Sequence, residues 1–175
     1  MPPAQFSLLP GKTKDAATLA ALHTAVANHL TNKHGRGPWS AETSEKAVLF
    51  GMRMSQVYVA RLDGEIVGTL RLTARKPWAI DKKYFSPCKR ALYLLAMAIT
   101  PAKQRQGIGR QCLEEAKRLA RLWPADAILL DAYDAKAGAG GFYVRCGWTE
   151  TGRVSYRGAP LAYYELLLNN DKAAA

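Results

Sequence analysis

Seven segments of the chain carry patterns of hydrophobic and polar positions that are typical of β-strands. Residues 56–62 and 65–74 are rich in Val, Ile, Tyr and Thr, and Asp63-Gly64 between them signals a two-residue type I′ turn, so we expect an antiparallel hairpin. Residues 91–99 are almost wholly apolar, which is typical of a strand buried on both faces. The other predicted strands are 6–9, 127–132, 149–156 and 161–168.

Apolar residues at helical spacing predict helices between these strands. We expect Thr13 to cap the first helix, whose apolar face carries Leu19, Leu22, Val26 and Leu30. Ser40 is expected to cap a second helix that ends near Met52. A third helix, 107–123, is amphipathic, with Glu114 and Arg118 placed for an ion pair on its polar face, and a short helix covers 141–146. The expected apolar face of the third helix is Ile108, Cys112, Leu113, Ala116, Ala120 and Trp123.

The order of these elements predicts an α/β fold built on a mixed, mostly antiparallel twisted sheet of six to seven strands with helices on both faces. The chain has 175 residues, so we expect a single domain over residues 1–168, followed by a disordered tail at 169–175. With 49% hydrophobic and 22% charged residues, the composition excludes disordered, collagen-like and coiled-coil proteins.

Charge and cysteine content indicate the kind of partner and compartment. The chain holds 25 Lys and Arg against 14 Asp and Glu, a net charge of +11, which favours an anionic partner. The basic residues are scattered, so a nucleic acid is not the expected partner. Cys88, Cys112 and Cys146 have neither metal-site nor disulfide spacing, and no metal is expected. Because the sequence shows neither a signal peptide nor a membrane span, we expect a cytoplasmic protein with no membrane partner.

The segment with the clearest chemistry is 101–110, between the apolar strand and the amphipathic helix. Gly107 and Gly109 let the backbone approach a ligand closely, and the N–H groups at the start of a helix receive phosphate oxygens. An ordinary strand-to-helix turn would look similar. A Walker loop requires Lys and Ser or Thr after the last glycine, where this chain has Arg110 and Gln111, and a dinucleotide fingerprint requires a third glycine where it has Cys112.

Two motifs in this order resemble those of the GNAT N-acetyltransferase family. Gln104-x-x-Gly107-x-Gly109 after an apolar strand resembles the family's acetyl-CoA pyrophosphate loop, and residues 142–148 (FYVRCGW) are similar to its Phe/Leu-Tyr-x-x-x-Gly-Phe element. The resemblance covers residues 56–168. It implies the acyl-CoA N-acyltransferase-like fold, with acetyl-CoA as co-substrate.

The resemblance also implies roles for individual residues. The backbone of Met97, Ala98 and Ile99 would contact the pantetheine arm, and one N–H would polarise the thioester carbonyl. Tyr143 would lie near the sulfur as the general acid, although an aromatic that packs the short helix would look the same. Lys136 stands where many members have an Asn that helps to hold the cofactor, and it could contact a phosphate or face water. The residues that would hold the pyrophosphate are Gln104, Arg105, Gln106, Gly107, Ile108, Gly109 and Arg110.

The general base and the acceptor site are indicated by single residues and not by a motif. The apolar strand offers no carboxylate, so Asp131 is the candidate base, with Asp134 or a chain of waters as alternatives and a structural role for Asp131 also open. Trp78, Asp81 and Tyr84 could form an aromatic and acidic pocket for an amine, or belong to a loop that covers a hydrophobic edge.

The expected function is therefore acetyl-CoA-dependent N-acetylation, by direct transfer to a primary amine of a small molecule or a peptide. Cys112 and Cys146 fit buried apolar positions, which disfavours an acyl-cysteine mechanism. The alternative is a noncatalytic basic module on the same fold that senses acyl-CoA or binds RNA. The exposed edges expected of the final hairpin would allow a homodimer.

Overall fold

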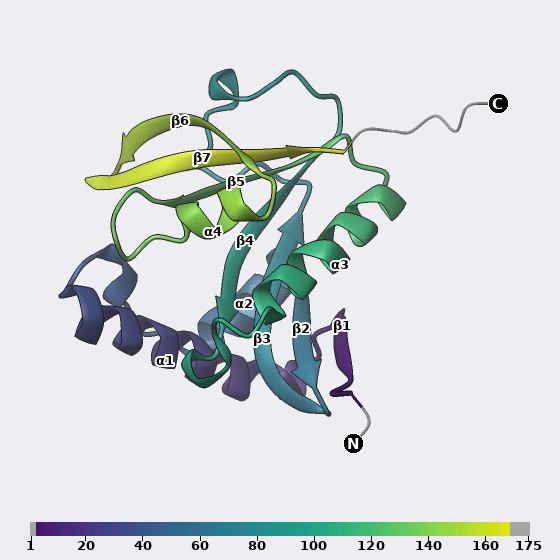
Figure 1. Cartoon of the computed structure of the whole chain (residues 1–175), viewed down its shortest axis with the longest axis vertical. Helices are drawn as coiled ribbons and strands as arrows, with labels where there is room; N and C mark the ends of the chain where they lie inside the picture. The colour runs from purple at the N-terminus through teal and green to yellow at the C-terminus, as the bar shows by residue number, and fades with distance from the viewer. Residues whose placement is uncertain (1–2, 169–175) are drawn as a thin grey trace. The chain divides into compact units, whose positions relative to one another are not determined.

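The computed structural model describes residues 3–168 as a mixed α/β fold with a seven-stranded, mostly antiparallel open sheet (Figure 1). The strand order is β1-β2-β3-β4-β5-β7-β6, and the class is the one expected from the sequence. The strands are β1 (Phe6–Pro10), β2 (Gln56–Leu62), β3 (Glu65–Thr73), β4 (Ala91–Ile99), β5 (Ala127–Tyr133), β6 (Thr149–Tyr156) and β7 (Ala159–Leu167). The helices are α1 (Ala16–His34), α2 (Glu45–Met54), α3 (Ile108–Leu122) and α4 (Gly140–Arg145), and the short 3₁₀ helices are η1 (Thr13–Asp15), η2 (Pro38–Ser40), η3 (Lys82–Tyr84) and η4 (Pro101–Lys103).

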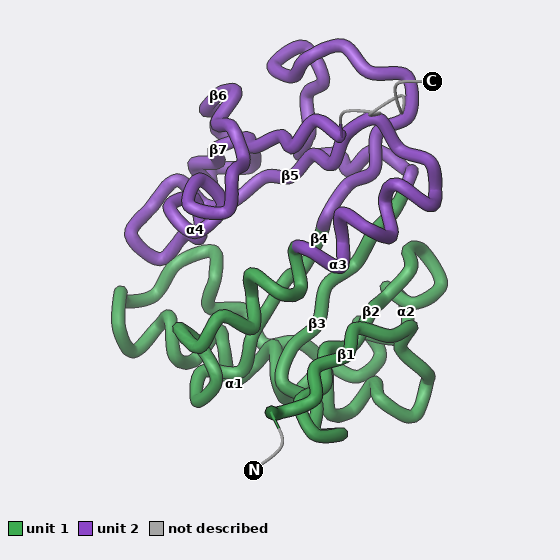
Figure 2. Tube along the Cα trace, turned by 45° about the vertical axis from the view of Figure 1, so that its right-hand side comes forward, with its two compact units in different colours: residues 1–73, 95–113 green, residues 74–94, 114–175 purple. Residues whose placement is uncertain are grey.

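The chain forms two compact units, which Figure 2 distinguishes by colour. Unit 1 comprises residues 1–73 and 95–113, and unit 2 comprises residues 74–94 and 114–175. Both β4 and α3 contribute residues to each unit. A single domain over residues 1–168 stays a prediction, and the tail predicted at 169–175 lies outside the described residues.

Unit 1 has its own core, where α1 and α2 pack on the β2–β3 hairpin. The buried residues of this core are Ala16, Leu19, Ala20, Val48, Val57 and Val59. The hairpin turn has positive φ angles at both central residues, 49° at Asp63 and 85° at Gly64, which confirms the predicted type I′ turn. The Arg61 guanidinium on β2 lies 2.8 Å from the Asp15 carboxylate, which is itself almost fully buried.

Unit 2 is built around Tyr163 on β7. Its buried core comprises Ile80, Phe85, Tyr93, Ala127, Leu129 and Tyr163. In this unit β4 pairs in parallel with β5 from Ala91 to Tyr93, and β7 pairs antiparallel with both β5 and β6. Glu165 on β7, between β5 and β6 in the sheet, is buried, and its carboxylate accepts hydrogen bonds from the Ser86 N–H (2.9 Å) and hydroxyl (2.6 Å).

Two helix caps differ from the sequence prediction. Ser44, not Ser40, caps α2, because its hydroxyl accepts from the Ala47 N–H at 3.1 Å. The Ser40 hydroxyl instead accepts from the Gly37 N–H and lies 2.6 Å from the Thr31 hydroxyl. Before α1, the Asp15 carboxylate accepts from the Lys12 N–H, so the predicted cap at Thr13 is wrong.

The third predicted helix is confirmed as α3, with two local corrections. Five of the six predicted apolar positions are buried, but Trp123 lies past the last helical residue and is 49% exposed. Glu114 pairs with Lys117 at 2.7 Å and Arg118 with Glu115 at 2.9 Å, so the i,i+4 pair expected between Glu114 and Arg118 gives way to two i,i+3 pairs. No helix within residues 3–168 is both long and apolar enough to cross a membrane.

Candidate functional site

The loop that joins β4 to α3 is held in unit 1 by its own side chains. The Gln104 side-chain amide donates to the Ile99 carbonyl at 2.9 Å, and the Gln106 amide donates to the Ala102 carbonyl at 3.1 Å. The backbone is left-handed at Arg105 (φ 61°) and at Gly107 (φ 82°), where glycine is the residue best suited to that conformation. Gln104 therefore anchors the loop to the end of β4, and its side-chain N–H group is engaged within the protein.

The charges of this loop are arranged for an anion. Arg105 and Arg110 are exposed, and the first turn of α3 carries no acidic residue. The N-terminus of a helix is its positive end, where acidic side chains stabilise it and basic ones do not. A bound anion would compensate this arrangement. The first intrahelical hydrogen bond runs from the Gln111 N–H to the Gly107 carbonyl, so the backbone N–H groups at the start of the helix are donors for such an anion. The residues of the loop thus fit the pyrophosphate that the sequence motif predicts.

The end of β4, where Met97, Ala98 and Ile99 are expected to contact a pantetheine arm, also lies in unit 1. The Thr100 N–H donates to the Val67 carbonyl at 2.8 Å. A Cβ on Gly68 would lie only 2.6 Å from the Ile99 side chain and 3.0 Å from the Ala98 carbonyl, so glycine permits this close approach of β3 to β4. Unit 1 therefore brings together every predicted cofactor residue except Lys136 and Tyr143.

Tyr143 lies in unit 2 on the short helix α4, and its side chain is buried. The ring centroid lies 5.3 Å from that of Phe142, 5.6 Å from Trp148 and 5.9 Å from Tyr164. Burial, and then the charges of Asp131 and Cys146, raise the pKa of the Tyr143 phenol well above its usual value. The phenol therefore keeps its proton at neutral pH, as a general acid must, while its ring contacts are also those of a packing residue. Its catalytic role stays a prediction.

Asp131 and Lys136 differ in their surroundings. Asp131 lies on β5 opposite Tyr163, and burial raises the pKa of its carboxyl. Lys136 is exposed in the turn between β5 and α4. Close packing leaves no room for a side chain at two glycines of this region. A Cβ on Gly138 would overlap the Tyr133 carbonyl, and one on Gly140 would overlap the Tyr164 hydroxyl.

The predicted acceptor residues Trp78, Asp81 and Tyr84 lie in unit 2, on the segment before β4. Trp78 is 85% exposed. The Asp81 carboxylate accepts from the Lys83 N–H at 3.1 Å, which caps η3, and lies 3.2 Å from the Lys83 ammonium. The Tyr84 ring packs edge-on against Tyr163. These contacts give Asp81 and Tyr84 structural roles, and the acceptor role of the three residues stays a prediction.

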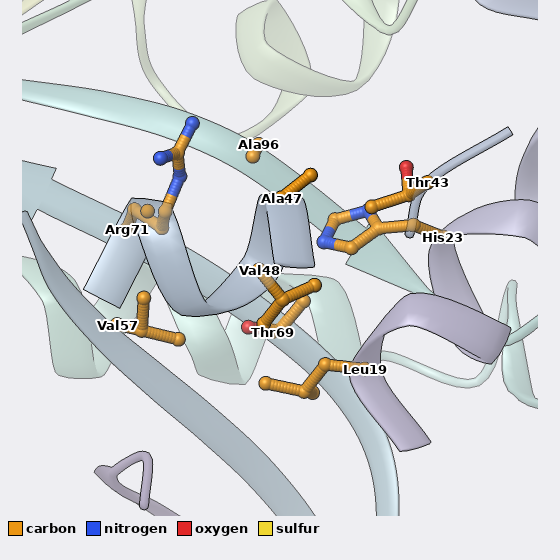
Figure 3. Close-up of a pocket in the computed structure, with 10 residues that line it drawn as sticks. Leu19, His23, Thr43, Ala47, Val48, Val57, Thr69, Arg71 and Ala96 are labelled. Atoms are coloured by element: carbon orange, nitrogen blue, oxygen red, sulfur yellow. The ribbon is translucent and has the colours of Figure 1, made fainter. Parts of the chain in front are cut away.

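A cavity of about 180 Å³ lies within unit 1, between α1, α2, β3 and β4 (Figure 3). Its polar side chains are His23 on α1, Thr43 before α2, and Thr69 and Arg71 on β3. Ala96, a lining residue on β4, has a positive φ of 47°, a strained conformation for a residue with a Cβ. The remaining lining residues are Leu19, Ala47, Val48, Gly51 and Val57.

Sequence reasoning missed this cavity. One signal was available, because Arg71 is the only charged residue between Ile66 and Thr73. Thr69 and Arg71 are two positions apart and therefore lie on the same face of the strand. A single cation on the otherwise uncharged face of an interior hairpin could have been marked as a candidate binding residue.

The Arg71 guanidinium has no hydrogen bond or ion pair with any residue in the range 3–168. Burial alone lowers the pKa of this side chain. Burial also lowers the pKa of His23, and the charge of Arg71 lowers it further, so the imidazole is neutral at pH 7. The cavity therefore carries one positive charge that no residue between 3 and 168 neutralises.

Comparisons with known proteins agree with this architecture. The yncA protein from Salmonella typhimurium, solved with its cofactor acetyl-CoA, is 16% identical with a TM-score of 0.67 over 97% of this chain and 96% of that chain. A GCN5-related N-acetyltransferase from Rhodopseudomonas palustris is 20% identical with a TM-score of 0.70 over 93% and 95%. A ribosomal-protein-alanine N-acetyltransferase from Brucella melitensis is 16% identical with a TM-score of 0.69 over 93% and 99%. At these identities the likeness shows the fold.

A search of curated proteins finds no match to this chain. The family model of the acetyltransferase (GNAT) family matches residues 24–148, well over half of the sequence. This match includes the loop at 104–110 and Tyr143, the two places where the sequence resemblance was strongest. The chain belongs to the GNAT family of acetyltransferases.

Proposed function

We propose that this protein is an acetyl-CoA-dependent N-acetyltransferase that moves an acetyl group by direct transfer to a primary amine of a small molecule or a peptide. The observation that carries the proposal is the loop between β4 and α3. Two exposed arginines and a glycine in left-handed conformation lie at a helix N-terminus without any acidic residue in its first turn. This donor set suits a pyrophosphate, and the family match supports the same assignment.

Each part of the loop and of β4 has a distinct task in this proposal. Arg105, Arg110 and the amides from Gly107 onward bind the pyrophosphate, with Lys136 as a further cation. Gln104 keeps the loop on the end of β4 through its bond to Ile99. The backbone of residues 97–99 orients the pantetheine arm. Acetyl-CoA supplies the acetyl group as a thioester, which an amine can attack directly.

Tyr143 and Asp131 are the proposed proton-handling groups. The Tyr143 phenol is protonated at neutral pH, since burial raises its pKa above the usual value near ~10, and it is the proposed proton donor to the departing sulfur. An alkylammonium acceptor has a pKa near ~10.4 and must lose a proton before it attacks. Asp131, whose carboxyl pKa is raised by burial, is a stronger base than an exposed aspartate and is the proposed acceptor of that proton.

The proposal is tested by amine-dependent thiol release from acetyl-CoA. The native protein should release thiol in the presence of primary amines. Arg105→Gln combined with Arg110→Gln should raise the KM for acetyl-CoA by about tenfold or more, because two charge-assisted contacts to phosphate are lost. Arg157→Gln, an exposed arginine in the β6–β7 turn, makes the same kind of charge change away from the loop and should leave the KM unchanged. Tight acetyl-CoA binding without release by any amine would favour the acyl-CoA sensor instead.

We also propose that the protein forms a homodimer through β6. This strand ends the sheet order, so one of its edges has no neighbouring strand among the described residues and could pair with a second copy. Sedimentation velocity should give twice the 19.2 kDa chain mass, and Val154→Pro on β6 should return the mass to that of one chain.

A further inference from the structure

The cavity in unit 1 is lined by two basic side chains and by no acidic one. The Arg71 guanidinium is partly buried and has no partner among the described residues. Removing a cation from water without a compensating anion costs free energy. A side chain held in this way is better explained by a ligand than by the stability of the fold.

The position of Arg71 also indicates that its charge is directed into the cavity. Its guanidinium lies so close to α2 that a Cβ on Gly51 would be 2.7 Å from a guanidinium nitrogen. The charge of Arg71 lowers the pKa of His23 on α1, another lining residue, so its field extends across the cavity. Figure 3 shows the side chains of Arg71 and His23, which belong to two different elements, β3 and α1.

We propose that this cavity is the acceptor site, and that the acceptor is a small primary amine that carries a carboxylate, which pairs with Arg71. The inference rests on the proposed N-acetyltransferase function and names its substrate class. With His23 neutral, the cavity holds a single positive charge, which one carboxylate balances. The planar guanidinium fork matches a carboxylate with two parallel hydrogen bonds.

The size and place of the cavity agree with this assignment. A volume of about 180 Å³ corresponds to roughly six water molecules, which suits a compound of amino-acid size. Ala96 lines the cavity and precedes Ala98 and Ile99 on the same strand, where the pantetheine arm is proposed to lie. An amine fixed by its carboxylate on Arg71 would thus lie at the strand that presents the acetyl group.

The reaction at this site is a balanced acyl transfer. The amine nitrogen, after loss of its ammonium proton, forms a bond to the acetyl carbon and then loses a second proton. The carbon–sulfur bond breaks, and its electron pair goes to sulfur, which takes up a proton. The products are an N-acetylated amino acid and the free thiol.

The test compares α-amino acids with their carboxamides. The standard amino acids that carry a primary amine, except cysteine because its thiol would be counted in the assay, and their amides are supplied to the native protein with acetyl-CoA, and thiol release is measured. Binding of each acid and amide is also measured by calorimetry in the presence of CoA. At least one acid should be bound and acetylated with a kcat/KM at least tenfold above that of its amide, because the amide cannot accept a charge-balanced pair of hydrogen bonds.

Substitutions connect this preference to Arg71. Arg71→Gln should remove both the binding of the acid and the preference over the amide, and Arg71→Lys should restore part of each. Arg53→Gln on the exposed side of α2 makes the same charge change and should keep the native preference. Because the Arg71 charge has no partner among the described residues, Arg71→Gln should not lower the melting temperature, so a loss of binding cannot be attributed to unfolding.

Equal use of acids and amides, no binding of any acid, or an unchanged preference in Arg71→Gln would overturn the inference. Acetyl-CoA binding, titrated in the same samples, separates this failure from that of the proposed function. If acetyl-CoA binds and only amines without a carboxylate are acetylated, the N-acetyltransferase proposal holds and the acceptor class is wrong. If acetyl-CoA does not bind, the proposed function itself fails, and the acceptor class falls with it.

Discussion

The Arg71 guanidinium on β3 lies against the backbone of α2 at Gly51, so closely that a Cβ on Gly51 would be 2.7 Å from one of its nitrogens. Gly51 is a buried helical residue, a position where glycine normally weakens a helix. Its absence of a side chain is explained by the space that Arg71 occupies. A residue with a side chain at position 51 would therefore stabilise α2 but would displace the Arg71 guanidinium.

Gly51→Ala should separate these two effects. Alanine stabilises a helix interior by up to about 1 kcal/mol relative to glycine, so the melting temperature should rise by ~2–4 °C. The new Cβ should displace the flexible end of Arg71 and raise the KM for a carboxylate-bearing acceptor about tenfold. Lys46→Ala, at an exposed position of α2, should change neither quantity greatly. An unchanged KM in Gly51→Ala would show that the position of Arg71 is not important for acceptor binding.

His23 should make the stability of the protein depend on pH. Its pKa is lowered in the folded state from 6.5, first by burial and then by the charge of Arg71. The unfolded chain therefore binds a proton at a higher pH than the folded one. The free energy of unfolding should fall as the pH falls from 6.5 toward the lower folded pKa, and His23 should contribute no further loss below that.

Urea unfolding of the native protein and of His23→Gln between pH 8 and 5 measures this effect. The variant should lose less stability on acidification than the native protein. His29→Gln measures what an exposed histidine on the same helix contributes. If His23→Gln shows the same pH dependence as the native protein, the imidazole of His23 is not buried in the way the structure indicates.

Tyr143→Phe should reduce turnover without reducing cofactor affinity. The phenylalanine ring can keep the contacts with Phe142, Trp148 and Tyr164, whereas the proton donor is lost. Loss of a general acid typically reduces kcat by about 10²–10⁴-fold. Tyr156→Phe on β6 is the matched control and should keep the native kcat. Equal kcat values for native protein and Tyr143→Phe, at equal acetyl-CoA affinity, would assign Tyr143 to packing alone.

The ion pair between Asp15 and Arg61 should stabilise unit 1. The Asp15 carboxylate lies 2.8 Å from the guanidinium and also accepts from the Lys12 N–H at 2.9 Å. Asp15→Asn removes the buried negative charge that pairs with Arg61 and accepts from the Lys12 N–H. This change should lower the free energy of unfolding by about 2 kcal/mol and the melting temperature by ~4–8 °C. Asp63→Asn, in the exposed type I′ turn where asparagine is favoured, should have little effect. Equal melting temperatures for the two variants would contradict this role for Asp15.

The regular elements of this protein could be predicted where one local signal decided them. Asp63-Gly64 fixes its hairpin because both residues accept positive φ. The apolar run at 91–99 forms β4 as predicted, but only Leu92, Tyr93, Leu94 and Ala98 are buried and Ala96 is exposed, so the expected burial on both faces holds for part of the strand. The caps could not be predicted from local sequence. Ser40 and Ser44 are equally good cap residues, and the choice depends on Thr31, whose hydroxyl meets that of Ser40 across a loop.

The same limit explains which parts of the candidate site could be found. The loop at 104–110 is contiguous in sequence, so its motif could be recognised there. The cavity at Arg71 combines α1, α2, β2, β3 and β4, and only the fold brings these segments together. Glu165 on β7 is a further case, since its buried carboxylate accepts hydrogen bonds from Ser86, 79 residues away in the sequence.

Titration of the protein with acetyl-CoA by calorimetry shows directly whether the loop between β4 and α3 binds this co-substrate. Gly107→Glu and Gly158→Glu form a matched pair, because both glycines have positive φ (82° and 78°) and a Cβ added to either would meet no atom within 4 Å. The two variants therefore share the same strain and charge change, but only the first lies in the loop before α3. We expect micromolar binding in the native protein and in Gly158→Glu, and loss of binding in Gly107→Glu. No binding to the native protein, or equal binding by both variants, would show that this loop is not an acetyl-CoA site.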